Sequence, residues 1–364
     1  MDETGELVYL NADGEIEFRE YEVPDPEPGA VMAEVVRANV CGSELHILGG
    51  HHPLSELVMG HEVVCRVAAL GDGVETDYAE RPVSEGDLIA PVYYRTCRRC
   101  PACQRGQFYL CHNRDEGWLS DPDDPPHFHG TYGTHYHIGP DQYFYRVPEG
   151  LTPSTVAAAN CALSQVLFGI DEVDVSYGES VVIQGAGGLG LNSVAVCNER
   201  GAETIVIEGT DGRIERAEAF GADHVIDFRE HDTVEARAER VRELTDGLGA
   251  DVGIEVAGVP EAFTEGIELV RTGGRYLELG NVTPGPTAEF DVGGLTRKSI
   301  SIVSAVRYQP WYLRKALSFL ADTAEKYPYD DLLDATFPLR EVEEAFEVSR
   351  NREVTRATLD PHAD

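Results

Sequence analysis

The chain has 364 residues, of which 42% are hydrophobic, and this length suits about two domains with ordinary packed cores. Acidic residues number 65 against 29 Lys and Arg, which gives a formal net charge of -36. A surface of this sign repels nucleic acids and anionic membranes, so we expect neither as a partner.

Lysine is almost absent from the sequence, which contains only Lys298, Lys315 and Lys326. In about 1 M salt the Debye length falls to roughly 3 Å, so the surface carboxylates hardly repel one another while they still hold water and cations. The composition resembles that of haloarchaeal proteins and predicts a halophilic protein in a salt-filled cytoplasm. A merely acidic mesophilic protein is the alternative, but it does not account for so little lysine relative to arginine.

The N-terminus, MDETGELVYL, is acidic and has no basic region, long apolar run or small-residue cleavage site, so we expect no secretory signal. No apolar stretch is recognised that reaches the roughly 20 residues of a membrane helix. The sequence therefore predicts a soluble, cytoplasmic protein.

Up to about residue 160 the sequence consists of short alternating or apolar runs broken by Gly, Pro and Asp, which predicts a β-rich domain with many loops. Segment 112–133 is too rich in Asp, Pro and Gly for a regular element, and long loops of this kind usually carry function. Metal binding is the alternative to a half-exposed strand for the histidines in and after this loop, and we favour the strand. These histidines are His127, His129, His135 and His137.

Four cysteines within this half follow the pattern C-x2-C-x2-C-x7-C: Cys97, Cys100, Cys103 and Cys111. Tetrahedral sulfur coordination needs four soft ligands from a compact loop, and the two-residue gaps let successive thiolates face one point. We predict a closed structural zinc lobe at about residues 95–113. Two local disulfides are the alternative, but the lack of a targeting segment favours metal.

A second metal site can be assembled from Cys41, His61 and Cys161. Taken singly, a buried cysteine usually behaves as a small hydrophobic residue, which is what we expect of Cys65 and Cys197. A lone histidine is more often a hydrogen-bonded core residue than a metal ligand. The three together would leave zinc with an open fourth position for water or substrate.

From about residue 163 strands alternate with helices, which predicts a parallel sheet covered on both faces. Strand SVVIQ runs into GAGGLG, a G-x-G-x-x-G in which Gly185 permits a tight turn, Gly187 a close pyrophosphate and Gly190 close helix packing. The next strand, TIVIE, ends on Glu208, where a carboxylate can bind the adenosine ribose diol. These features predict a dinucleotide site.

Glu208 also favours NAD, because a carboxylate there would repel the extra phosphate of NADP. Arg213 and Arg216 lie just beyond it and could pair with that phosphate, so NADP remains the alternative.

The motifs CGSELH, GHE, the four-cysteine lobe, NCALS, GAGGLG and RATLD occur in this order. With them the chain resembles the medium-chain zinc-dependent alcohol and polyol dehydrogenases over essentially its whole length. The resemblance implies an α/β protein with a GroES-like, β-rich catalytic domain, residues 1–162 and 305–364. It implies a Rossmann domain with a doubly wound parallel sheet, residues 163–304, that binds NAD(P).

The resemblance also implies roles for individual residues. Ser43 and His46 match the proton relay of the family, and Glu44 stands where a carboxylate orients the ligand imidazole, a position at which the family often has Asp. Arg356 matches the basic residue that contacts the coenzyme pyrophosphate. The catalytic zinc residues implied, with Glu62 as a carboxylate able to approach the ion, are Cys41, His61, Glu62 and Cys161. The candidate coenzyme-binding residues are Gly185, Gly187, Gly188, Leu189, Gly190, Glu208, Arg213 and Arg356.

The implied function is hydride transfer between NAD(P) and a primary or secondary alcohol, a polyol or a sugar, with an aldehyde or ketone as the product and two zinc ions per chain. Zinc lowers the pKa of a coordinated water to about 7 and should acidify an alcohol similarly. Family members usually pair through the edge of the Rossmann sheet, here SISIVSAV, so we expect a homodimer or homotetramer. The expected pocket residues are Leu48, His51, His52, Tyr93, Tyr94, Trp118 and Phe128.

Three other interpretations remain open. A zinc-independent quinone or enoyl reductase of the same fold gives no reason for Cys41, His61 and Cys161. A non-catalytic nucleotide-binding protein gives no reason for the relay residues, and a zinc hydrolase gives none for the glycine-rich loop.

Overall fold

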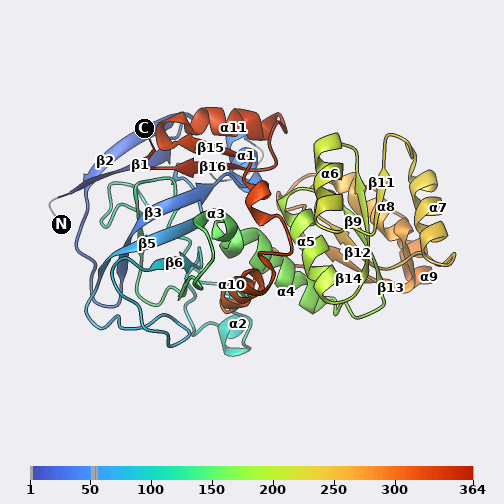
Figure 1. The fold of residues 1–364 in the computed structure, drawn as a ribbon, viewed down its shortest axis with the longest axis horizontal. Helices are drawn as coiled ribbons and strands as arrows, with labels where there is room; N and C mark the ends of the chain where they lie inside the picture. Colours follow the sequence, from blue (N-terminus) through green and yellow to red (C-terminus); the bar gives the residue numbers. More distant parts are fainter. Residues whose placement is uncertain (1–2, 51–53, 55, 364) are drawn as a thin grey trace. The chain divides into compact units, whose positions relative to one another are not determined.

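Figure 1 shows the computed structural model of the chain, which describes residues 3–50, 54 and 56–363. The chain divides into two compact units. Unit 1 comprises residues 1–164, 309–325 and 329–364, and unit 2 comprises residues 165–308 and 326–328.

Unit 1 carries ten of the strands in the described ranges. They are β1 (Thr4–Leu10), β2 (Ile16–Glu22), β3 (Val31–Asn39), β4 (Leu57–Val58), β5 (Glu62–Leu70), β6 (Leu88–Pro91), β7 (His135–Ile138), β8 (Phe144–Arg146), β15 (Ala335–Pro338) and β16 (Ala357–Asp360). A three-stranded sheet has the order β2-β1-β4, and a seven-stranded sheet has the order β15-β16-β3-β5-β6-β8 with β7 paired to β3. Apart from β15 and β16, which are parallel, the paired strands are antiparallel. The predicted β-rich, loop-rich domain is thereby confirmed.

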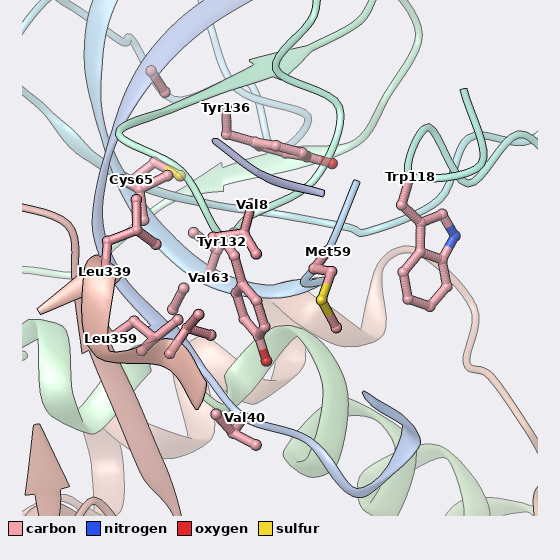
Figure 2. Packing of buried hydrophobic residues seen from close by; sticks show 14 of the residues in the cluster. Val8, Val40, Met59, Val63, Cys65, Trp118, Tyr132, Tyr136, Leu339 and Leu359 are labelled. Atoms are coloured by element: carbon pink, nitrogen blue, oxygen red, sulfur yellow. The ribbon is translucent and has the colours of Figure 1, made fainter. Parts of the chain in front are cut away.

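The C-terminal segment of the chain is part of this larger sheet. Strand β16 pairs with β3 with Leu359 opposite Ala38, so the last strand lies beside one of the first. Leu359 is fully buried in a hydrophobic cluster that includes Met59 and Tyr132, as Figure 2 shows. Such burial is the main favourable term in folding, and here it joins the two ends of the sequence.

The helices of unit 1 are short and mostly connect strands. They are α1 (Gly42–Leu48), α2 (Pro101–Gln104), α3 (Pro153–Val156), α10 (Tyr312–Thr323) and α11 (Val342–Arg350), with the 3-10 turns η1 (Phe108–Leu110), η3 (Tyr329–Leu332) and η4 (Leu339–Glu341) and the π-helical turn η2 (Ala159–Leu163). In α11 the residues Val342, Ala345 and Phe346 are buried at helical spacing, which is the pattern of a helix with one apolar face. The ring of Phe346 lies 6.0 Å from that of Tyr132, so this face packs on the core of unit 1.

Unit 2 is a six-stranded parallel sheet with helices between its strands. The strands are β9 (Ser180–Gln184), β10 (Glu203–Glu208), β11 (His224–Asp227), β12 (Ala250–Glu255), β13 (Val270–Glu278) and β14 (Ser301–Ser304), and the helices are α4 (Ser164–Glu172), α5 (Gly188–Glu199), α6 (Asp211–Ala219), α7 (Val234–Leu244), α8 (Pro260–Leu269) and α9 (Val292–Lys298). The spatial order is β11-β10-β9-β12-β13-β14, and every pair is parallel. This order reverses direction between β9 and β12, as in doubly wound dinucleotide-binding sheets, and confirms the predicted Rossmann fold.

One helical stretch, Pro153–Glu172, is long and apolar enough by length and composition to cross a membrane, which the sequence interpretation did not recognise. Of its most apolar window, 78% is buried inside the protein. We therefore interpret this stretch, which runs through α3, η2 and α4, as a core helix.

The place of β16 in the core predicts a large effect of Leu359→Ala on stability. Removing this fully buried side chain should lower the free energy of unfolding by about 2–5 kcal/mol, because it removes buried area and leaves a cavity. The exposed Leu119 is the control, and Leu119→Ala should change that free energy by less than about 0.5 kcal/mol. Urea unfolding at constant salt measures both, and equal midpoints would contradict the packing of the C-terminal strand.

Candidate active site

The four cysteines of the lobe converge on one point in unit 1. Their sulfur atoms all lie within 4.8 Å of one another, and three separations are 3.5 Å (Cys97 to Cys111), 3.6 Å (Cys100 to Cys103) and 4.0 Å (Cys100 to Cys111). In a tetrahedral site with Zn–S bonds of about 2.3 Å, two sulfur atoms lie about 3.8 Å apart, and the three separations are close to this value. All eight cysteines of the chain are unpaired, so the disulfide alternative is wrong and the set fits zinc.

The turns of the lobe direct backbone N–H groups at some of these sulfurs. The backbone N–H of Cys97 donates to the sulfur of Cys111 at 3.3 Å, and the N–H of Cys100 donates to the sulfur of Cys97 at 3.3 Å. Hydrogen bonds from the backbone, of which the one from Arg99 is the strongest, lower the pKa of Cys97 to about 6. Such donors stabilise the thiolate, which is the form that binds metal.

The lobe is also attached to the C-terminal part of unit 1. The side-chain amide of Gln309 accepts from the backbone N–H of Phe108 at 3.0 Å and donates to the carbonyl of Gly106 at 2.7 Å. The ring of Phe108 lies 5.7 Å from that of Trp311 in an edge-on arrangement. The metal therefore organises a loop that is held to the segment leading into α10.

Four further donors converge from three elements of unit 1. Cys41 precedes α1, His61 directly precedes β5, Glu62 begins β5, and Cys161 lies in the π-helical turn η2. Their ligand atoms all lie within 4.8 Å of one another. The structure thus brings together residues that are far apart in the sequence, and the two sulfurs, one imidazole and one carboxylate fit a catalytic zinc site.

Glu44 fixes the imidazole of His61. Its Oε1 atom lies 2.6 Å from Nδ1 of His61, and its Oε2 atom accepts from the backbone N–H of Cys41 at 3.1 Å. Both Glu44 and His61 are buried. Burial lowers the pKa of His61, but Glu44 and Cys41 outweigh it and raise that pKa well above its usual value. The contact with Glu44 occupies Nδ1, which leaves Nε2 as the nitrogen for a metal.

Glu62 is fully buried, and its carboxylate contacts the charged Arg356 and the amide of Asn39. Its Oε2 atom accepts from the guanidinium of Arg356 and from the side-chain amide of Asn39 at 3.2 Å. Burial raises the pKa of Glu62 to about 7, an effect that Arg356 opposes. Its other oxygen, Oε1, is buried without a hydrogen-bond partner among the described residues, which fits a carboxylate able to approach an ion.

The environment of Glu62 adds two findings that sequence analysis missed. Asn39, at the end of β3, carries no motif that would have identified it. Arg356, expected on the coenzyme pyrophosphate, is paired with Glu62 in this structure, and its contact with the coenzyme stays a prediction.

The two relay candidates lie on α1 beside these residues. Ser43 and His46 are three positions apart, so they share one face of the helix, and both are half-buried. The hydroxyl of Ser43 donates to Oε2 of Glu44 at 3.2 Å.

Two of the expected pocket residues contact the catalytic cluster. The ring of Tyr93 lies 5.2 Å from that of His61, and the ring of Trp118 lies 5.1 Å from it. The indole N–H of Trp118 donates to Glu116 at 3.2 Å. Tyr94 is buried, and its ring packs edge-on against that of Tyr93 at 5.3 Å. It therefore supports Tyr93 from behind.

The other pocket candidates are placed differently. Phe128 is fully buried in a separate hydrophobic cluster with Leu7 and Met32, so it is a core residue and its assignment to the pocket was wrong. Leu48 packs, partly buried, against the main core of unit 1. His51 and His52 lie outside the described residues.

The predicted histidine strand is found only in part. Strand β7 contains His135 and His137, and all of its residues are buried and not half-exposed, whereas His127 and His129 lie in the loop before it. His137 lies 2.9 Å from a carboxylate oxygen of Glu27, and Nδ1 of His135 lies 2.9 Å from the hydroxyl of Thr134. In the described part of the chain neither belongs to a group of metal-ligating side chains.

In unit 2 the glycine-rich loop follows β9 as predicted. Gly185 has φ of 105°, a conformation that L side chains rarely adopt, and a Cβ at Gly190 would lie 2.0 Å from the carbonyl oxygen of Gly185. Gly187 precedes α5, which begins at Gly188, so the N-terminus of the helix faces the end of the loop. Only glycine permits this close approach of helix and strand.

Glu208 holds this loop. Its buried carboxylate accepts from the backbone N–H groups of Ala186 at 3.1 Å, Gly209 at 2.7 Å and Thr210 at 3.0 Å, and Arg213 lies 3.9 Å from it. A carboxylate with three such donors keeps a fixed position at the end of β10. The contact with Ala186 joins it directly to the glycine-rich turn.

Comparisons with known proteins agree with these sites. Residues 27–149 match the family model "Alcohol dehydrogenase GroES-like domain" and residues 188–322 the model "Zinc-binding dehydrogenase". The chain is 32% identical over 353 residues to the 5-exo-hydroxycamphor dehydrogenase of Pseudomonas putida, covering 93% of this chain and 94% of that protein. It is 30% identical over 351 residues to the sorbitol dehydrogenase of Halalkalibacterium halodurans, covering 94% and 96%.

Among solved structures, an alcohol dehydrogenase from Thermotoga maritima superposes with a TM-score of 0.92 at 30% identity, covering 99% of this chain and 100% of that one. The chain therefore belongs to the medium-chain zinc-dependent alcohol dehydrogenase family. It is a zinc-dependent NAD(P) dehydrogenase acting on CH–OH groups, with the four-cysteine cluster as its structural zinc site and the Cys/His/Glu cluster as its catalytic zinc site.

The two metal clusters share no residue, which predicts that each zinc can be lost alone. Cys103→Ala should lower the zinc content from two ions per chain to one and lower the melting temperature, because the lobe loses a ligand of a closed site. Elemental analysis of purified protein measures the content. The matched control is Cys65→Ala, which removes an equally buried thiol outside both clusters and should keep two ions. Two ions retained in Cys103→Ala would contradict the assignment of the lobe.

Proposed function

We propose that this dehydrogenase acts on a cyclic or aryl alcohol whose ring packs between Tyr93 and Trp118. The observation that carries the proposal is the placement of both aromatic rings within 5.2 Å of the His61 ring. The indole N–H of Trp118 is occupied by Glu116, so the indole offers its apolar face. That the similar Pseudomonas putida protein is a hydroxycamphor dehydrogenase supports the same class of substrate.

The chain's own residues prepare the substrate for oxidation. Zinc held by the catalytic cluster would supply a Lewis acid for the substrate oxygen, and a bound nicotinamide would supply the hydride acceptor. Cys41 and Cys161 supply thiolates, and Glu44 holds His61 by Nδ1 so that Nε2 is its ligand atom. We assign Glu62 as the carboxylate that approaches the ion without permanent attachment, because Arg356 already occupies one of its oxygens.

The proton released from the alcohol needs a path to solvent. We propose that the hydroxyl of Ser43 takes up this proton and that His46, three positions along α1, passes it outward. The hydroxyl of Ser43 donates to Glu44 in this structure, so it must turn away from Glu44 when it donates along the relay.

The main test is a panel of cyclic, aryl and linear alcohols, polyols and aldose sugars, assayed with NAD and NADP in molar KCl. Turnover should be fastest with the cyclic or aryl alcohols and should fall by at least about 1,000-fold in Cys41→Ala, since one ligand removed from an open zinc site removes its Lewis acid. Elemental analysis and circular dichroism check that this variant is folded and keeps its structural zinc. Wild-type turnover in Cys41→Ala would refute the mechanism, and a preference for polyols would refute the aromatic pocket.

We also propose NAD as the coenzyme, with Glu208 binding the adenosine ribose. Glu208→Ala should raise the KM for NAD relative to that for NADP by at least about tenfold, because hydrogen bonds to a charged group contribute about 1.5–3 kcal/mol. The same change releases Arg213, which lies 3.9 Å from the carboxylate, to pair with a 2′-phosphate. Steady-state kinetics with both coenzymes measure the ratio. An unchanged ratio would discard the ribose assignment.

The enzyme's environment and assembly follow as further proposals. The net charge of -36 supports function in a cytoplasm rich in salt, and the eight unpaired cysteines support a reducing compartment. Strand β14 is at the edge of the sheet of unit 2, where its Ile302 is exposed. We propose that this edge pairs with a second copy in a homodimer or homotetramer, because an edge strand presents unpaired backbone groups.

A further inference from the structure

Asn160 is a buried amide that immediately precedes the zinc-site cysteine Cys161. Both residues lie in η2, a π-helical turn in which the N–H of Leu163 donates to the carbonyl of Ala158. Turns of this kind are rare and widen the helix by one residue, and they occur frequently at functional sites. Here the turn carries two neighbouring residues with different roles. The Asn160 amide is fully buried, and the Cys161 thiol belongs to the metal cluster.

The Asn160 side chain has a hydrogen-bond partner for each of its polar groups. Nδ2 donates to the carbonyl oxygens of His61 at 3.0 Å and Pro91 at 3.1 Å, while Oδ1 accepts from the backbone N–H of Val63 at 3.3 Å. Two carbonyls and one N–H require two donors and one acceptor, which is what an amide offers. A carboxylate would face two carbonyl oxygens, and an apolar side chain would leave three buried backbone groups without this partner.

The three partners belong to segments that build the active site. His61 and Val63 flank Glu62, so the amide holds the backbone of the ligand-bearing end of β5 on both sides of that residue. Pro91 ends β6, two residues before Tyr93, whose ring contacts that of His61. One side chain therefore links the turn that carries Cys161 to the start of β5, next to His61, and to the segment that carries the proposed pocket wall.

We propose that Asn160 is a positioning residue that sets the separation of Cys161 and His61, so that both reach the same zinc ion. Zn–S and Zn–N bonds of about 2.3 and 2.0 Å leave little tolerance for movement of one ligand segment against another. Residues that hold metal ligands from outside typically change metal affinity about 10- to 100-fold when they are replaced. The inference rests on the assignment of Cys161 and His61 to the catalytic zinc site.

The test compares Asn160→Ala with Gln142→Ala, and its main measurement is the rate at which a chelator removes the catalytic zinc. Gln142 is a matched control in the same unit, because it is buried and its amide also makes three hydrogen bonds, to Val92, Tyr136 and Gly139. None of these three belongs to either metal cluster. Asn160→Ala should lose the catalytic zinc at least about tenfold faster than wild type while keeping the structural zinc. Gln142→Ala should release it at the wild-type rate, even where its melting temperature falls equally.

Cobalt in place of the catalytic zinc provides a second readout. The visible absorption of Co2+ reports the geometry of its ligands, so its bands should shift in Asn160→Ala and stay unchanged in Gln142→Ala. Equal zinc release and equal cobalt spectra in the two variants would overturn the proposal and leave Asn160 as a core amide. A wild-type protein that holds one zinc, in the lobe alone, would instead overturn the proposed function itself.

The wild-type protein also allows a measurement that needs no variant, for the case in which Asn160→Ala does not fold. If the amide couples the zinc ligands, removing the catalytic zinc should speed hydrogen exchange of the Val63 N–H, which donates to Asn160, by at least about tenfold. The N–H of Gly139, which donates to Gln142, is the internal control and should not change. Unchanged exchange at Val63 would overturn the coupling.

Discussion

The hydrogen bond between Glu44 and His61 is the contact on which the catalytic cluster depends. At 2.6 Å and inside the protein, it determines which nitrogen of the imidazole is available for a metal. The same carboxylate accepts from the backbone N–H of Cys41, the residue that precedes α1, so one side chain aligns two ligands and the start of the helix. An acidic residue at this third helical position is also what stabilises a helix N-terminus, so local structure and chemistry have the same requirement.

Charge compensation imposes a second constraint, because Glu44 and Glu62 are both fully buried. A buried carboxylate without a partner costs several kcal/mol, and the thiolates of a zinc site add further negative charge. Arg356 neutralises Glu62 although 294 positions separate them in the sequence. The segment that carries Arg356 continues into β16, which pairs with β3, so the same segment adds a strand to the core sheet and neutralises Glu62.

In unit 2 one carboxylate again joins fold and function. Glu208 ends β10 and accepts three backbone N–H bonds, one of them from Ala186 in the glycine-rich turn. These bonds fix the turn and the strand end, which reduces the entropy lost when a ligand binds. The close approach of Gly190 to Gly185 then brings the N-terminus of α5 to the loop.

The sequence by itself determined the parts of this protein that depend on near neighbours. The four-cysteine lobe, the glycine-rich turn with Glu208 and the β-rich and alternating halves were all predicted, because closely spaced residues leave a pattern that backbone geometry explains. The resemblance in motif order added the dispersed ligands. Only the tertiary structure decided that Arg356 neutralises Glu62 and Asn39 donates to it, that Phe128 is a core residue, and that Asn160 binds the backbone of His61. Asn160 and His61 are 99 positions apart, and a contact over such a distance depends on how strands pair and bury polar groups, which no local spacing encodes.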